Sequence, residues 1–139
     1  METEDSHNTA VVVADNRETV LQAVSTTLEK AGFTVLPASS GAEALQYCRA
    51  RAHDSRHAVQ LAIIDATTDG LNVAELVGQL DAISPGMRTL FLTAGDEEQS
   101  LRGIAAPGRV RGFLHKPFRR AHLLGQVLEM MDRPLALTA

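Results

Sequence analysis

The sequence predicts an α/β domain in which a parallel sheet is covered by helices on both faces. Short apolar runs alternate along the chain with segments of helical periodicity, which is the pattern of repeated strand–helix units. Several runs are apolar at every position, as expected for strands that are buried on both faces of a sheet. The chain has 139 residues, which is enough for one such domain with a core of its own.

The expected strands and helices follow one another in regular alternation. The runs expected to form strands are residues 10–14, 33–36, 61–65, 89–93 and 110–114. Helical periodicity is present in residues 17–31, about 40–50, 73–80, a short segment from Asp96, and 123–131. Gly32 is typical of a helix end, and Ser40 with Glu43 forms a capping-box pattern at a helix start. Residues 49–60 are polar and aperiodic, so we expect a long surface loop there.

The composition predicts a single cytoplasmic domain. We expect residues 1–9 to be a disordered lead, residues 10–132 to fold, and residues 133–139 to be a short tail. No apolar stretch is long enough to span a membrane, and the polar, acidic start of the chain does not resemble a secretory signal. The single cysteine, Cys48, excludes an internal disulfide and fits a reducing compartment. A net charge of −4 without a lysine-rich block argues against direct DNA binding.

Polar residues follow four of the five predicted strands. Asp15 and Asn16 follow the first strand, Asp65 ends the third, Thr93 ends the fourth, and Lys116 follows the fifth. Because these ends meet at the edge of the sheet where open α/β folds bind ligands, we expect the side chains to lie close together. Two carboxylates suit a divalent cation such as Mg²⁺, and one of them could instead act as a nucleophile. A lysine and a hydroxyl would neutralise the oxygens of a transferring phosphoryl group.

Five short motifs occur in order along the chain at this spacing. Residues 14–16 are Ala-Asp-Asn after a strand, and residues 38–45 read Ala-x-x-Gly-x-Glu-Ala-Leu. Asp65 closes the third strand, residues 93–94 are Thr-Ala, and residues 116–118 are Lys-Pro-Phe. Together they resemble the receiver domains of two-component response regulators, over about residues 11–131.

The resemblance implies a flavodoxin-like (βα)5 fold, a doubly wound sheet with strand order 2-1-3-4-5. It implies Mg²⁺-dependent phosphoryl transfer to Asp65 from a histidine kinase or a phosphotransfer protein. A downstream protein would then be bound through the fourth helix, the fifth strand and the fifth helix. Thr93 and Lys116 would contact the phosphate, Phe113 would change its exposure as a switch residue, and the Lys116–Pro117 peptide bond would be cis. Such a domain is a signalling switch rather than an enzyme, can form a homodimer, and does not bind membranes.

The metal ligands implied by the resemblance are Asp15, Asp65, Asn16 and the backbone carbonyl of Thr67. Asn16 stands where the family usually has its second acid, so we expect Mg²⁺ to bind weakly. The loop after Asp65 also departs from the family, because residues 68–69 are Thr-Asp where Met-Pro is usual.

Three other functions remain open. Asn16 and the altered loop favour a degenerate receiver that binds proteins without being phosphorylated. A phosphatase of the haloacid dehalogenase type needs a second aspartate two residues after its nucleophile, where this chain has Thr67. A flavin-binding flavodoxin needs a phosphate loop rich in glycine and hydroxyl groups after the first strand, which residues 15–18 do not supply.

A group of arginines gathers positive charge near the last predicted helix and its approach. Solvated surface is the default interpretation, and a docking face for an acidic partner is the sharper hypothesis. These residues are Arg102, Arg109, Arg111, Arg119 and Arg120.

Overall fold

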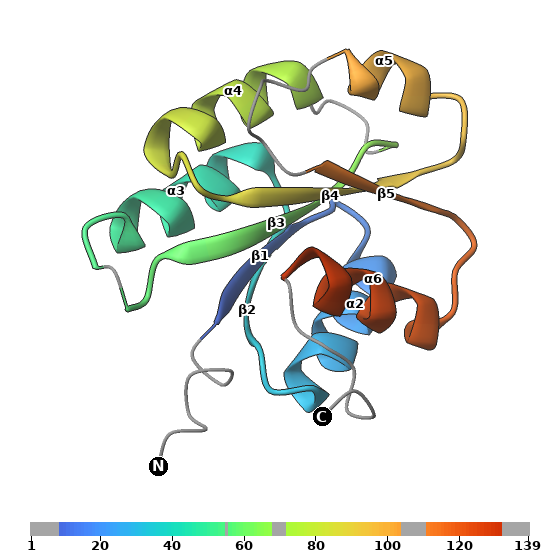
Figure 1. Cartoon of the computed structure of the whole chain (residues 1–139), viewed down its shortest axis with the longest axis horizontal. Coiled ribbons are helices and arrows are strands. Elements are labelled where there is room, and N and C mark those ends of the chain that lie inside the picture. Colours follow the sequence, from blue (N-terminus) through green and yellow to red (C-terminus); the bar gives the residue numbers. More distant parts are fainter. Residues whose placement is uncertain (1–8, 55, 68–71, 104–110, 132–139) are drawn as a thin grey trace.

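A five-stranded parallel sheet runs through the centre of the molecule (Figure 1). The computed structural model describes residues 9–54, 56–67, 72–103 and 111–131. The strands lie in the order β2-β1-β3-β4-β5, so the first strand is inside the sheet and the chain adds the third on its other side. This confirms the predicted parallel sheet and its strand order.

Strands and helices alternate through the described residues, as predicted. The strands are β1 (Ala10–Ala14), β2 (Thr34–Ala38), β3 (Val59–Asp65), β4 (Arg88–Thr93) and β5 (Arg111–His115). The helices are α2 (Glu18–Lys30), α3 (Gly41–Arg51), α4 (Val73–Ile83), α5 (Glu98–Arg102) and α6 (Arg120–Met130). Within these described ranges, no helix combines the length and the apolar character needed to cross a membrane.

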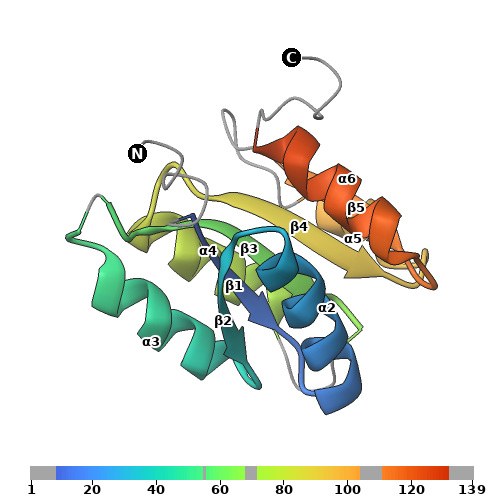
Figure 2. The same ribbon diagram turned by 90° about the horizontal axis from the view of Figure 1, so that it is seen from below.

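Helices cover both faces of the sheet. Helices α3, α4 and α5 lie on one face, and α2 and α6 lie on the other (Figures 1 and 2). Each face has its own apolar core, because successive side chains of a strand point to opposite sides. In β1, Val12 packs in the core under α3 and α4, whereas Val11 and Val13 pack in the core under α2 and α6. All five residues of β1 are buried, which explains its continuous apolar run.

Local signals in the sequence set several boundaries correctly. Gly32 has φ = 100°, a left-handed conformation that glycine adopts without strain, and it follows the end of α2. The Ser40 side chain accepts a hydrogen bond from the backbone N–H of Glu43 at 3.1 Å, which confirms Ser40 as the N-cap of α3.

The predicted long loop at residues 49–60 is wrong at both ends. Helix α3 continues to Arg51, and β3 already begins at Val59. Val59 is buried while Gln60 is exposed, so buried and exposed side chains alternate at the start of β3, as in a strand with one solvent-exposed face. The apolar run in the sequence therefore begins only after the strand has started. The predicted start of the fifth strand, Val110, lies outside the described residues.

Candidate functional site

The carboxyl ends of the strands bring distant residues together, as predicted from the sequence. In the sheet register, Ala14 of β1 lies opposite Ile64 of β3, so Asp15 and Asp65 follow side by side. Asp65 itself lies opposite Leu92 of β4, one residue before Thr93. The backbone N–H of Lys116 donates to the carbonyl of Thr93 at 2.8 Å, which fixes the lysine beside this edge.

Asp65 is the centre of the cluster and is fully buried. Its Oδ1 accepts hydrogen bonds from the backbone N–H of Thr67 at 2.8 Å and from the Thr67 hydroxyl at 2.6 Å. Its Oδ2 accepts from the Lys116 ammonium and, at 2.6 Å, from Nη2 of Arg17. A buried carboxylate requires such partners because it has lost its water. The side chains of both Lys116 and Arg17 therefore lie directly on the predicted phosphoacceptor.

The two aspartates are electrostatically coupled. Burial alone would raise the pKa of Asp65, but hydrogen bonds with Asp15, Lys116 and Thr67 hold that pKa well below its usual range. Burial, followed by the hydrogen bond with Asp65, raises the pKa of Asp15 to about 6. Asp65 is thus the stronger acid of the pair and remains an ionised carboxylate near neutral pH, as a nucleophile must.

Thr93 is buried at the end of β4. Its hydroxyl has no hydrogen-bond partner among the described residues, which is unusual because a buried hydroxyl without a partner costs free energy. The Lys116–Pro117 peptide bond, which follows β5, is cis, as the resemblance implied. The edge therefore presents a free hydroxyl beside a carboxylate and an ammonium group.

Phe113, the predicted switch residue, is half-buried in β5. Its ring stacks on Phe91 of β4, with centroids 5.6 Å apart. The guanidinium carbon of Arg102 lies 4.6 Å from the centroid of the Phe113 ring, a cation–π distance. Glu98 pairs with both Arg102 and His115, so the guanidinium over the ring belongs to a small polar cluster.

The predicted metal ligands do not fit an octahedral Mg²⁺ as they lie. Both oxygens of Asp65 already carry hydrogen bonds, and Nη2 of Arg17 lies on the one that also binds Lys116. Nε of Arg17 lies 3.7 Å from Oδ1 of Asp15, so a single guanidinium reaches both carboxylates. The side chain of Asn16 is exposed. Mg²⁺ needs near-ideal octahedral geometry and oxygen ligands, and here a cation of the chain lies among them.

Arg17 is the site residue that the sequence analysis missed. Its neighbours Asp15 and Asn16 were identified from the end of β1, but Arg17 itself was assigned only to the start of a helix. A usable signal exists, because a basic residue two positions after a strand-end aspartate lies near the ligand-binding edge. Thr67 was expected to contribute its carbonyl, and its backbone N–H and hydroxyl are the groups found on Asp65.

The arginine group near the last helix does not form one face. The side chain of Arg111 is only 5% exposed and pairs with Asp81 at 2.7 Å, so Arg111 cannot belong to a docking surface. It also donates to the hydroxyl of Thr89 at 2.9 Å. Arg102, Arg119 and Arg120 are exposed, and Arg109 lies outside the described residues.

The comparison with known protein families shows to which family the chain belongs. The sequence profile of the response regulator receiver domain family matches residues 11–128. The chain belongs to this family. Receiver domains are phosphorylated on an aspartate, generally bind Mg²⁺ for that reaction, and interact with histidine kinases or phosphotransfer proteins. They are typically non-enzymatic signalling modules, although receiver domains can dephosphorylate themselves.

Solved receiver domains share the fold of this one. A CheY-like receiver domain protein from Methanospirillum hungatei JF-1 is 22% identical, with a TM-score of 0.71, over 89% of this chain and 94% of the other. The chemotaxis response regulator CheY4 of Vibrio cholerae is 27% identical, with a TM-score of 0.69, over 88% of this chain and 98% of the other. These matches show that the receiver domain has the flavodoxin-like fold that the resemblance implied.

The curated relatives are much longer proteins. The sensor kinase CckA of Brucella abortus (strain 2308) is 25% identical over 131 residues, which are 94% of this chain and 13% of the relative. The transcriptional regulatory protein GlrR of Escherichia coli (strain K12) is 26% identical over 134 residues, which are 96% of this chain and 29% of the relative. The receiver domain thus spans less than a third of the length of either relative.

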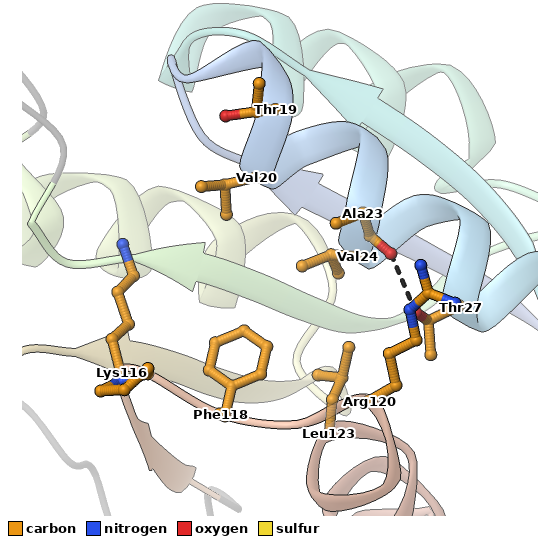
Figure 3. Close-up of a pocket in the computed structure, with 10 residues that line it drawn as sticks. Thr19, Val20, Ala23, Val24, Thr27, Lys116, Phe118, Arg120 and Leu123 are labelled. Atoms are coloured by element: carbon orange, nitrogen blue, oxygen red, sulfur yellow. Dashed lines mark hydrogen bonds between the residues drawn. The ribbon is translucent and has the colours of Figure 1, made fainter.

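A cavity of about 640 Å³ lies between α2 and the start of α6. Figure 3 shows the Phe118 ring between these two helices, with Lys116 at one end of the pocket and Arg120 at the other. Val20, Val24 and Leu123 contribute to its largely apolar lining. Among the described residues, no carboxylate lines this cavity, and Asp65 lies outside it.

Proposed function

We propose that this receiver domain accepts a phosphoryl group on Asp65 from a histidine kinase or a phosphotransfer protein. It then signals to a downstream protein through the face formed by α5, β5 and α6. The observation that supports this most directly is the Lys116 ammonium on Oδ2 of the fully buried Asp65 carboxylate. A fixed cation at a buried nucleophile is the arrangement that stabilises the added charge of a phosphoryl group. The domain acts in the cytoplasm, as a switch rather than as an enzyme.

The reaction is a transfer between two nucleophiles. An oxygen of the Asp65 carboxylate attacks the phosphorus, the P–N bond of a phosphohistidine breaks, and its electron pair leaves with the imidazole. The product is an acyl phosphate on Asp65. Lys116 neutralises charge on the phosphoryl oxygens, and the free hydroxyl of Thr93 supplies a hydrogen bond to one of them. Asp15, Asn16 and the Thr67 carbonyl are the candidate ligands, with Asp65, for a divalent ion, but only after Arg17 has left Asp65.

Phe113 provides a route from the phosphate to the signalling face. Thr93 ends β4, and in the sheet register it lies opposite His115, two residues after Phe113 on β5. A shift of Thr93 toward a phosphate would open space near the Phe113 ring, which is half-buried against Phe91. We propose that the two positions of this ring are the two states that phosphorylation biases.

The test is the intact mass of the protein after incubation with Mg²⁺ and a small-molecule phosphodonor. A single phosphate adduct is expected for the wild type and for Asp96→Asn, which removes an exposed carboxylate near the same edge. The adduct should be absent in Asp65→Asn. An adduct that persists in Asp65→Asn would refute Asp65 as the acceptor.

One observation favours a second function, a receiver domain that binds partners without being phosphorylated. The Arg17 guanidinium lies on the carboxylate oxygen that would otherwise face the donor. If no adduct forms even with a broad set of histidine kinases, while a partner still binds the α5, β5 and α6 face, this second function replaces the first.

A further inference from the structure

Arg17 holds both buried carboxylates of the site from the solvent side. Its Nη2 donates to Oδ2 of Asp65 at 2.6 Å and to the hydroxyl of Thr67 at 3.1 Å, and its Nε lies 3.7 Å from Oδ1 of Asp15. The side chain of Arg17 is 49% exposed, whereas those of Asp15 and Asp65 are 1% and 0% exposed. The guanidinium therefore lies between the carboxylates and water.

This position is not needed to form the helix that follows. Arg17 is the N-cap residue of α2, but its side chain makes no capping hydrogen bond. The turn is held by the Asp15 side chain, because its Oδ1 accepts a hydrogen bond from the backbone N–H of Arg17 at 2.9 Å, and this bond does not involve the Arg17 side chain. The side chain is thus available for the carboxylates, and its replacement leaves the local backbone bonds in place.

The charges of the cluster are already balanced. The two carboxylates of Asp15 and Asp65 face two cations of the chain, Arg17 and Lys116. A divalent ion bound by Asp15 and Asp65 would lie close to the Arg17 guanidinium, which donates a hydrogen bond to Asp65. Position 16 is an asparagine and adds no negative charge to offset this further cation. Two cations so close to one carboxylate repel each other.

We propose that Arg17 is a built-in cation that occupies the place of the divalent ion in the resting domain and competes with that ion for Asp15 and Asp65. Arg17 must leave Asp65 before the ion binds, and its half-exposed side chain can swing into water to do so. The proposal rests on the proposed function only for the role of Asp65 as acceptor. The competition itself is a property of the unphosphorylated protein.

The test compares Mg²⁺ affinity in the wild type and in Arg17→Met, by isothermal titration calorimetry without any phosphodonor. Methionine keeps much of the length of the side chain and removes its charge. A charge-assisted hydrogen bond to a buried carboxylate predicts that Arg17→Met binds Mg²⁺ about tenfold more tightly. The melting temperature should also rise more on addition of Mg²⁺ in Arg17→Met than in the wild type, because a ligand stabilises the state that binds it.

The matched control is Arg49→Met, which removes the same charge from an exposed position. Helix α3 starts at the carboxyl end of β2, so Arg49 in its last turn lies toward the opposite edge of the sheet. Its Mg²⁺ affinity should equal that of the wild type.

Two results would overturn the proposal: an Mg²⁺ affinity of Arg17→Met that equals the wild-type value, or one that is weaker. The failure of this proposal is distinguishable from the failure of the proposed function. A phosphate adduct on Asp65 with unchanged Mg²⁺ affinity in Arg17→Met refutes only the competition. Tighter Mg²⁺ binding in that variant without any adduct refutes only the phosphoacceptor function.

Discussion

Two clusters in the described part of the chain each pair one carboxylate with two basic side chains, but in opposite surroundings. In the first, Asp65 pairs with Arg17 and Lys116, and in the second, Glu98 pairs with Arg102 and His115. The side chain of Asp65 is 0% exposed and that of Glu98 is 21% exposed. Burial, rather than the number of partners, separates the two clusters, because water can replace the partners of Glu98 but not those of Asp65.

Because the two clusters differ in burial, we expect them to have different roles. The buried cluster holds a carboxylate that is ionised and desolvated, beside a hydroxyl that has no partner among the described residues, and such an arrangement costs free energy. In the exposed cluster, Arg102 lies over the ring of Phe113, which we propose to be a switch residue, and small energies would suffice to bias such a side chain between two positions. Substitutions in the first cluster should therefore change reactivity strongly, and substitutions in the second should change stability slightly.

The largest effect is expected from Lys116→Met. The Lys116 ammonium would neutralise negative charge on the phosphoryl oxygens during transfer. Its loss should slow formation of the phosphate adduct by about 100-fold, as is usual when an enzyme loses one hydrogen-bond donor to a developing charge. The measurement is a time course of intact mass with a small phosphodonor. The matched control is Lys30→Met, which changes the other lysine of the chain, at the exposed end of α2, and should leave the rate unchanged. Equal rates in the two variants would mean that the buried cluster has no special reactivity.

Thr93→Val should slow adduct formation less than Lys116→Met does, and it should also stabilise the folded protein. The substitution keeps the shape of the side chain and removes a buried hydroxyl that has no partner among the described residues. The free energy of unfolding should rise by about 1 kcal/mol, while adduct formation slows by about tenfold.

The control for Thr93→Val is the same substitution four residues earlier in β4. The hydroxyl of Thr89 accepts a hydrogen bond from the buried Arg111, so Thr89→Val should lower the free energy of unfolding by about 1 kcal/mol. Urea denaturation measures both variants. If Thr93→Val also destabilises the protein, its hydroxyl has a structural partner and is not held free for a phosphate.

The buried cluster could be predicted in large part from the sequence. Asp15, Asp65 and Thr93 each end or follow an apolar run, and parallel strands necessarily bring such ends to one edge. The strand order followed from the resemblance and not from periodicity, since the apolar pattern alone does not say which strands are neighbours. The physical reason for this success is that backbone register fixes where short side chains at strand ends lie.

Long side chains explain what the sequence did not predict. Arg17 reaches an aspartate 48 residues further along the chain, and Arg111 reaches Asp81, 30 residues back. An arginine has many rotamers, and its partner is selected by burial and charge after folding rather than by any local pattern. The same holds for Arg102, whose position over Phe113 depends on the packing of α5 against β5.

The smallest effect is expected from Glu98→Gln, and it should depend on pH. Hydrogen bonds from His115 and then from Arg102 lower the pKa of Glu98 in the folded protein. Its ionised form therefore stabilises the fold above the ordinary pKa of a glutamate, and this contribution disappears as the pH falls through the lowered value. The urea midpoint of Glu98→Gln should lie slightly below that of the wild type at neutral pH, and the two should converge in acid.

Glu18→Gln is the matched control, because Glu18 is an exposed acid in the first turn of α2 and forms no ion pair within the described residues. A pH-independent difference for Glu98→Gln would show that this cluster acts through packing around Phe113 rather than through charge.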